Sequence, residues 1–364
     1  MIAARAGADT CAPFVSVIIP ARNESASIER CLRAVFEQDY PRDRYEVIVA
    51  DGMSDDGTRR IVASLASGPS GDDRVTLLDN PRRIVPAAMN LGIARCKGKI
   101  IVRVDGRTRI APDYLSRCVE TLARTGADGV GGVMIPVASS SLTGAIALAT
   151  SNMFGMGNSA FHYAQRERES DSVYLGAYPR RTFSRFGGYD EDLVRNQDDE
   201  LNYRIRARGG RIILNPAIRS WYSPRASVAS LFRQYVGYGW WKPHVMARVP
   251  SMIAARHLAP PAFVLALAAL LAAGALRPSL LAAAAGVLLL HALLSLSFCT
   301  AGGRPPGEDG TAAAPTWRSL SLVPVVTLVI HVAYGSGLLL GLLGLVSRPR
   351  AGSDSALRTP GAGT

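Results

Sequence analysis

The sequence lacks the short motifs that mark several common enzyme classes. Its five cysteines are scattered and form no C-x-x-C pair, which argues against a zinc site or a disulfide framework. Neither G-x-G-x-x-G nor G-x-x-x-x-G-K-[ST] occurs, so the fingerprints of nucleotide-dependent dehydrogenases and P-loop enzymes are missing. The first residues, MIAARAGADTCAPF, contain no apolar run, so we expect no secretory signal.

Acidic residues are missing from one long segment. The 364-residue chain has 41 Lys and Arg against 29 Asp and Glu, a net charge of +12, yet only 19% of its residues are charged. Residues 201–256 contain ten of the basic residues and no acidic one. Because this segment directly precedes a long apolar region, it indicates an anionic membrane surface as a partner. We expect no nucleic acid partner, because no recognition motif accompanies the charge.

Three long apolar stretches follow the basic segment, at residues 258–276, 279–299 and 320–346. A membrane-spanning helix needs about 20 apolar residues, so we predict a transmembrane region of about three helices at 257–347. Three crossings would place the tail, residues 348–364, on the side opposite to a cytoplasmic N-terminal domain. The arginines of this tail favour the cytoplasmic side, so the number of crossings stays open.

Strands and helices alternate in the first part of the chain. Short apolar, β-branched runs at 15–20, 45–50, 75–78 and 100–104 predict strands, and a segment with helical features follows each of them. This alternation predicts an α/β fold with a doubly wound, mostly parallel sheet. Such sheets bind their ligands beyond the carboxyl ends of the strands, where we therefore expect the chemistry.

Acidic residues stand at the predicted strand ends and at the start of one predicted helix. Asp51 ends the second strand and Asp105 follows the fourth, while Asp198, Asp199 and Glu200 begin a helix. Converging carboxylates can bind a sugar hydroxyl or base edge, hold a divalent cation or accept a proton. Asp is also common in turns, because it bonds its own backbone, so a purely structural role stays open for each residue.

Five segments in order resemble glycosyltransferase family 2: VSVIIPARNE, VIVADGMSDDGT, NLGIARCKGKIIVRVDG, GAYPRRTFSRFGGYDE and NQDDELNYRIRARGG. Within that family, the chain looks most similar to exopolysaccharide glucosyltransferases of the succinoglycan type that carry C-terminal membrane helices. The similarity covers roughly residues 14–245. It implies a GT-A fold, a nucleotide-diphosphate sugar as donor and an inverting glycosyl transfer.

The resemblance also implies roles for single residues. Pro20, Arg22 and Glu24 would line the nucleotide pocket. Asp51 would contact the base or ribose, because ring N–H and hydroxyl donors need an acceptor there. Asp105 matches the first carboxylate of the family's D-x-D motif, which orients a divalent cation on the diphosphate.

Two positions depart from the family pattern. Arg107 replaces the second carboxylate of the D-x-D motif, and Gln197 replaces the glutamate of the E-D motif. Asp198 matches the aspartate of that motif, the general base for the acceptor hydroxyl, with Asp199 as the alternative if the register is shifted by one. We predict Mg²⁺ or Mn²⁺ as cofactor, held by Asp105; its necessity stays open, because a guanidinium can itself bind diphosphate.

A basic and aromatic segment, residues 227–256, separates the predicted catalytic domain from the apolar stretches. Its spacing is helical, and we expect Trp240 and Trp241 to end this helix before Pro243. The helix either lies among the lipid headgroups or packs on the domain with its aromatic side chains in the core. As candidates for the acceptor or membrane side we predict Arg225, Arg233, Trp240 and Lys242.

Together these features predict five parts: an N-terminal tail (1–13), a GT-A domain (14–226), an interfacial segment (227–256), a transmembrane region (257–347) and a flexible tail (348–364). We expect an enzyme of the cytoplasmic membrane with its catalytic domain facing the cytoplasm. It would transfer a sugar, glucose by resemblance, to a polyprenyl-diphosphate-linked glycan in exopolysaccharide synthesis. The alternative is a catalytically weak scaffold in a polysaccharide assembly complex, favoured by the two departures from the family motifs.

Overall fold

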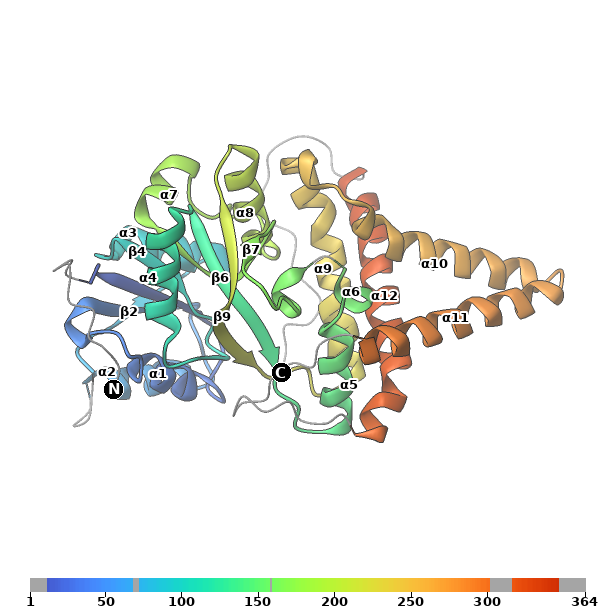
Figure 1. Ribbon diagram of the computed structural model, residues 1–364, viewed down its shortest axis with the longest axis horizontal. Helices are drawn as coiled ribbons and strands as arrows, with labels where there is room; N and C mark the ends of the chain where they lie inside the picture. The colour runs from blue at the N-terminus through green and yellow to red at the C-terminus, as the bar shows by residue number, and fades with distance from the viewer. Residues whose placement is uncertain (1–11, 68–71, 158, 302–315, 347–364) are drawn as a thin grey trace.

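A computed structural model describes residues 12–67, 72–157, 159–301 and 316–346. These residues form an α/β body and a long helical extension (Figure 1). The tails expected at 1–13 and 348–364 lie outside the described residues, apart from residues 12 and 13.

One mixed sheet forms the centre of the body. The described strands are β1 (Val15–Ala21), β2 (Tyr45–Asp51), β3 (Val75–Asp79), β4 (Ile100–Arg103), β5 (Thr108–Ile110), β6 (Gly129–Pro136), β7 (Arg168–Glu169), β8 (Tyr174–Pro179) and β9 (Ile212–Tyr222). Their order is β3-β2-β1-β4-β8-β6-β9-β5, with β7 beside β9. The four strands predicted from the sequence are confirmed and pair in parallel. From β4 onward parallel and antiparallel pairs mix, because β8 runs against both of its neighbours.

Helices cover both faces of the sheet (Figure 1). The helices of the body are α1 (Ile28–Phe36), α2 (Thr58–Ser67), α3 (Val85–Arg95), α4 (Tyr114–Thr125), α5 (Ser141–Thr150), α6 (Met153–Met156), α7 (Arg180–Phe186) and α8 (Gln197–Ala207), with short 3₁₀ turns at Arg42–Arg44, Ala160–His162 and Pro250–Met252. Alternate residues of β1 enter opposite cores: Val17 and Ile19 pack with α1 and α4, whereas Ile18 packs with α3 and α8. Burial on both faces explains the continuous apolar run of this strand.

Four long helices follow the body: α9 (Val228–Arg248), α10 (Ala255–Gly274), α11 (Ser279–Ala301) and α12 (Trp317–Val346). The last three contain the predicted apolar stretches, and each is long and apolar enough to cross a membrane. Helix α9 packs along α12, with Tyr235 and Trp241 buried. Of the two alternatives, a helix among the lipid headgroups and a helix packed on the domain, the second therefore describes the later half of α9. Near the start of α9, Phe232 is 40% exposed.

The expected end of this helix before Pro243 is wrong, because α9 continues to Arg248. A proline inside a helix removes one backbone hydrogen bond and crowds the carbonyl four residues earlier. Here the residues around it are anchored by tertiary contacts, since Trp241 and Val245 pack into one cluster with Leu193. Burial of such side chains contributes about 1.5–3 kcal/mol each, which offsets the lost hydrogen bond.

Candidate active site

Two loops at the carboxyl ends of β1 and β2 are joined by hydrogen bonds. The side-chain amide of Asn23 donates to Asp55 at 3.0 Å, and the N–H of Asp55 donates back to Asn23 at 3.1 Å. The N–H of Glu24 donates to the hydroxyl of Thr58 at 2.8 Å. Asn23 has φ 54°, a left-handed conformation that asparagine tolerates better than most residues. These contacts fix the loop that carries the predicted nucleotide-binding residues.

Asp51, at the end of β2, is fully buried and has charged and polar partners. Arg59 donates to its Oδ2 at 2.9 Å, and so does the N–H of Ser54, also at 2.9 Å. The same guanidinium bonds Asp79 at the end of β3, at 2.7 Å. Asp51 is thus held in one orientation by its neighbours at the carboxyl ends of the strands.

The other predicted nucleotide-side residues lie close by. Pro20 is buried in β1, in register with Ala50 of β2. Arg22 is exposed and lies against Gly52: a Cβ on Gly52 would stand 3.1 Å from the Cβ of Arg22. The glycine therefore leaves room for the arginine stem beside Asp51.

Arg103, the last residue of β4, joins two of the predicted carboxylates. It is 6% exposed, its Nε donates to Asp105 Oδ1 at 2.7 Å, and its Nη1 bonds Asp198 Oδ1. The structure thus brings Asp105 and Asp198 to one guanidinium, although 93 residues separate them in the sequence. Sequence reasoning missed Arg103; a basic residue inside a buried strand was the available signal, because such a charge needs carboxylate partners.

The two carboxylates at the start of α8 differ in their surroundings. Burial raises the pKa of Asp198 to about 6, an effect that the Arg103 guanidinium partly opposes and the Asp105 charge reinforces. Burial also acts on Asp199, but its ion pair with Lys242, at 2.6 Å, outweighs it and lowers the pKa. Asp199 also accepts from Ser172 at 2.9 Å. Asp198 is therefore the better placed proton acceptor of the two.

A second ion pair stands beside Asp105. Arg107, the residue in the second D-x-D position, donates to Glu24 Oε1 at 2.6 Å. Arg225 lies near it: burial and the charges of Arg107 and Arg195 lower the pKa of the Arg225 guanidinium. Within the described residues Arg225 bonds Gln234 at 3.0 Å, and neither Arg195 nor Arg225 has an acidic partner there.

The remaining membrane-side candidates are distributed differently. Lys242 is 6% exposed and paired with Asp199 of α8. Arg233 is exposed on α9. Trp240 packs on α12, where its ring would stand 3.1 Å from a Cβ on Gly344. Lys242 is thus the candidate that contacts a carboxylate of α8, whereas Arg225 lies near Arg107. Arg195 joins them as a residue that sequence reasoning missed.

The metal-ligating side chains of the site suit a cation that binds together with the substrate. Among the described residues, no three His, Cys, Asp or Glu side chains are grouped to hold a metal ion. Asp105 is 27% exposed in its side chain and Arg103 bonds its Oδ1, so Oδ2 is left for a ligand. Mg²⁺ commonly binds through one or two carboxylates plus substrate phosphates and waters. A single carboxylate therefore fits a cation that a diphosphate helps to hold.

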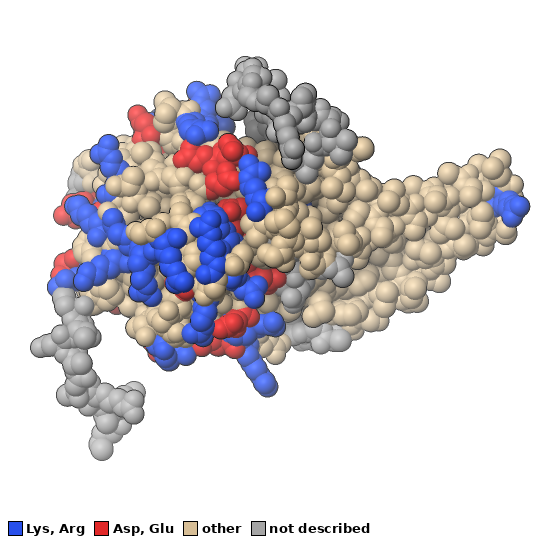
Figure 2. All heavy atoms as spheres, turned by 90° about the horizontal axis from the view of Figure 1, so that it is seen from above, with Lys and Arg blue, Asp and Glu red and all other residues tan. Residues whose placement is uncertain are grey.

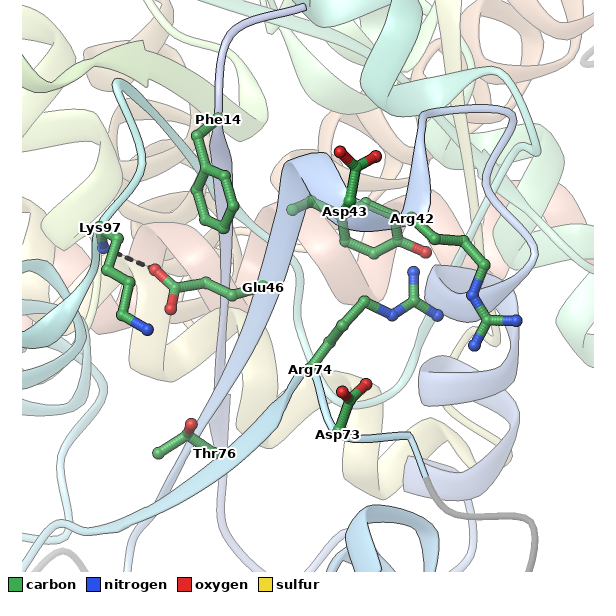
Figure 3. Close-up of a pocket in the computed structure, with 9 residues that line it drawn as sticks. Phe14, Arg42, Asp43, Glu46, Asp73, Arg74, Thr76 and Lys97 are labelled. Atoms are coloured by element: carbon green, nitrogen blue, oxygen red, sulfur yellow. Dashed lines mark hydrogen bonds between the residues drawn. The ribbon is translucent and has the colours of Figure 1, made fainter.

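A separate pocket of about 380 Å³ lies at the other end of the strands (Figure 3). Its lining includes Tyr45 at the start of β2 and Thr76 near the start of β3. Glu46 in this pocket accepts from the N–H of Lys97 at 2.5 Å and from Ser16 at 2.6 Å. It is thus remote from the carboxyl ends where the predicted site residues gather.

The mixed sheet, with carboxylates at the carboxyl ends of its strands, has the GT-A fold. A solved structure with this fold is the mannosyltransferase PcManGT from Pyrobaculum calidifontis, in complex with GDP-Man and Mn²⁺. Its TM-score is 0.57 at 23% sequence identity, over 92% of this chain and 88% of that one.

The particular family follows from sequence relatives. The family model described as glycosyl transferase family 2 matches residues 16–173. The succinoglycan biosynthesis protein ExoA of Rhizobium meliloti (strain 1021) is 35% identical over 61% of this chain and 67% of its own length. A dolichyl N-acetyl-alpha-D-glucosaminyl phosphate 3-beta-D-2,3-diacetamido-2,3-dideoxy-beta-D-glucuronosyltransferase of Methanococcus voltae is 30% identical over 62% and 72%. The chain belongs to glycosyltransferase family 2, which confirms the family and the fold expected from its sequence motifs.

Proposed function

We propose that this enzyme transfers glucose from a nucleotide-diphosphate sugar to a polyprenyl-diphosphate-linked glycan, with inversion at the anomeric carbon. The reaction would take place at the cytoplasmic face of the membrane, as a step of exopolysaccharide synthesis. The observation that supports the proposal is the group formed by Asp105, Arg103 and Asp198, in which both carboxylates pair with one guanidinium.

Asp198 is the proposed general base. A sugar hydroxyl is a poor nucleophile at neutral pH, so a positioned carboxylate must accept its proton as the anomeric bond breaks. Arg103 occupies Oδ1 of Asp198 and leaves Oδ2 for the acceptor hydroxyl. A pKa of about 6 keeps this carboxylate largely ionised at neutral pH and makes it a stronger base than an ordinary aspartate.

The donor would lie across the ends of β1, β2 and β4. Asp51 would accept from the base or ribose, with Pro20, Arg22 and Glu24 along the same pocket. Asp105 would hold a divalent cation, Mg²⁺ or Mn²⁺, which supplies positive charge for the departing diphosphate. Arg107 would add charge on the same side, since a guanidinium matches phosphate geometry.

The acceptor diphosphate would bind at Arg195 and Arg225. Two partly buried guanidinium groups without an acidic partner among the described residues favour an anion. Burial and the charges of Arg107 and Arg195 lower the pKa of Arg225, and a bound anion would relieve the repulsion between these charges. Both residues lie at α9, which connects the body to the apolar helices, so a lipid-borne diphosphate can reach them. The name of the Methanococcus voltae relative specifies a dolichyl-phosphate-linked sugar, which supports a lipid-linked acceptor in general.

The test uses the full-length protein in nanodiscs with a panel of nucleotide sugars. Release of nucleoside diphosphate that requires both one donor and a lipid-linked glycan supports the proposal. Release that is equal without the glycan overturns the acceptor assignment. If no donor yields nucleoside diphosphate, the result favours the alternative, a scaffold of an assembly complex. Arg107 and Gln197, the two departures from the family motifs, are the sequence features that favour this alternative.

A further inference from the structure

The apolar helices do not run in one direction. Helices α10 and α11 form a hairpin that projects away from the body, whereas α12 lies alongside α9 and crosswise to that hairpin (Figure 1). A bundle of three crossing helices would run in a common direction through the bilayer. The hairpin and α12 therefore differ in direction, although they are in contact.

The hairpin is exposed along its sides. Leu265 of α10 and Leu289 and Leu293 of α11 are 56%, 61% and 53% exposed, and only 17% of either apolar span is buried within the protein. A helix of 20 residues is about 30 Å long, which matches the hydrocarbon thickness of a bilayer. Figure 2 shows the hairpin as an uncharged surface with Lys or Arg at its tip, where Arg277 connects the two helices. The hairpin has the properties of a membrane-crossing element.

Helix α12, by contrast, is attached to the catalytic body. It runs in the same direction as α9 in very close contact: a Cβ on Gly337 would stand 2.3 Å from the carbonyl oxygen of Val236, and one on Gly341 2.4 Å from that of Trp240. At its other end, a Cβ on Gly144 of α5 would stand 2.6 Å from Ser319 Oγ. In α12, 44% of the apolar span is buried.

Polar contacts hold the hairpin to α12 and α6. His331 of α12 bonds the carbonyl oxygen of Phe154 in α6 at 2.9 Å, and its other ring nitrogen lies 3.1 Å from His291 of α11. The structure thus pairs His291 with His331. In an apolar environment such hydrogen bonds are costly to break. The hairpin is therefore fixed crosswise to α12 and cannot swing parallel to it without losing them.

We propose that the chain crosses the membrane only twice, through the α10–α11 hairpin, and that α12 lies along the membrane plane in the near leaflet. With the hairpin perpendicular to the bilayer, α9 and α12 run parallel to its surface and the catalytic body sits on that surface. The apolar character of α12 follows, because its surroundings are α9, the hairpin and lipid.

Two crossings place both ends of the chain on the same side of the membrane. They remove the conflict that three crossings create for the C-terminal arginines, Arg348 and Arg350, which favour the cytoplasmic side. The proposal concerns the path of the chain and goes beyond the proposed reaction, so it stands or falls independently of the sugar transferred.

The main experiment attaches a reporter to either end of the full chain in bacterial cells. Green fluorescent protein fluoresces when cytoplasmic, and alkaline phosphatase is active only when exported. We expect fluorescence and no phosphatase activity from fusions at both the N-terminus and the C-terminus. Fluorescence at one end with phosphatase activity at the other would overturn the proposal, because α12 would then cross.

A second experiment places a single label at the hairpin tip. In Arg277→Cys, we expect a membrane-impermeant maleimide to label intact spheroplasts above the background of the parent chain. In the matched variant Arg206→Cys, on the exposed side of α8, labelling should require inverted vesicles. Labelling of Arg277→Cys only in inverted vesicles, or in neither preparation, would overturn the two crossings of the hairpin. Transfer activity of each variant is measured separately, so a topological failure is distinguishable from a failure of the proposed function.

Discussion

Replacing Asp198 by asparagine tests the proposed chemistry most narrowly. The amide has nearly the same shape and its oxygen can still accept from Arg103, but it cannot accept a proton from the acceptor. General base catalysis contributes about 10²–10⁴-fold, so kcat should fall by that factor, equivalent to about 3–5 kcal/mol of transition-state stabilisation. The donor KM should change little, because the proposed donor-binding residues Asp51 and Asp105 are unchanged.

The pH profile adds an independent readout. Asp198 must be ionised to act, so kcat/KM should rise with pH through a pKa of about 6 and then level off. This acidic limb should disappear in Asp198→Asn. The control is Asp192→Asn, an exposed carboxylate that pairs with Arg248 and should leave both rate and profile unchanged. Wild-type kcat in Asp198→Asn, or an unaltered limb, would refute the assignment. Loss of kcat in Asp199→Asn with an intact fold would move the base to the neighbouring residue.

Three further predictions concern charge and packing. If Arg107 supplies part of the positive charge, as proposed, treatment with EDTA should reduce activity only partly. Complete loss restored by Mg²⁺ or Mn²⁺ would contradict that role. Arg195→Gln should raise the KM for a lipid-linked acceptor about 10- to 100-fold through loss of a charged hydrogen bond, whereas exposed Arg206→Gln should not. Gly337→Ala should lower the free energy of unfolding in detergent by about 1–3 kcal/mol, and with it the melting temperature. Gly286→Ala should not, because nothing lies within 4 Å of the added methyl. Equal melting temperatures of the two variants would contradict close α9–α12 packing.

The fold of the first half could be predicted because its signals are local. The continuous apolar, β-branched run Val15–Pro20 and the helical spacing from Ile28 both reflect burial through the local sequence pattern. The antiparallel course of β8 could not be read this way, because pairing direction depends on contacts between residues far apart in the sequence. The same limit applies to Pro243. A proline predicts the end of a helix, but here contacts of α9 with α8 and with Leu193 keep the helix intact.

The site residues that belong to family motifs could be predicted from the sequence. The residues that form ion pairs with them could not. Asp105 and Asp198 follow from the family resemblance, but Arg103, which joins them, has no motif of its own beyond being a charge in a buried strand. Lys242 was predicted on the acceptor side from its position among aromatic residues. Its ion pair with Asp199 depends on how α9 crosses α8, which the sequence does not record. The orientation of the apolar helices also depends on tertiary contacts, so hydropathy alone does not predict it.

The most direct test of the central claim follows a labelled sugar into lipid. Membranes containing the full chain are incubated with labelled UDP-glucose and a polyprenyl-diphosphate-linked glycan, and the products are extracted into organic solvent. The account predicts labelled glycolipid in the organic phase with the parent chain and at least about a hundredfold less with Asp198→Asn. Equal labelling by both proteins, or label that stays in the aqueous phase with the parent chain, would contradict it.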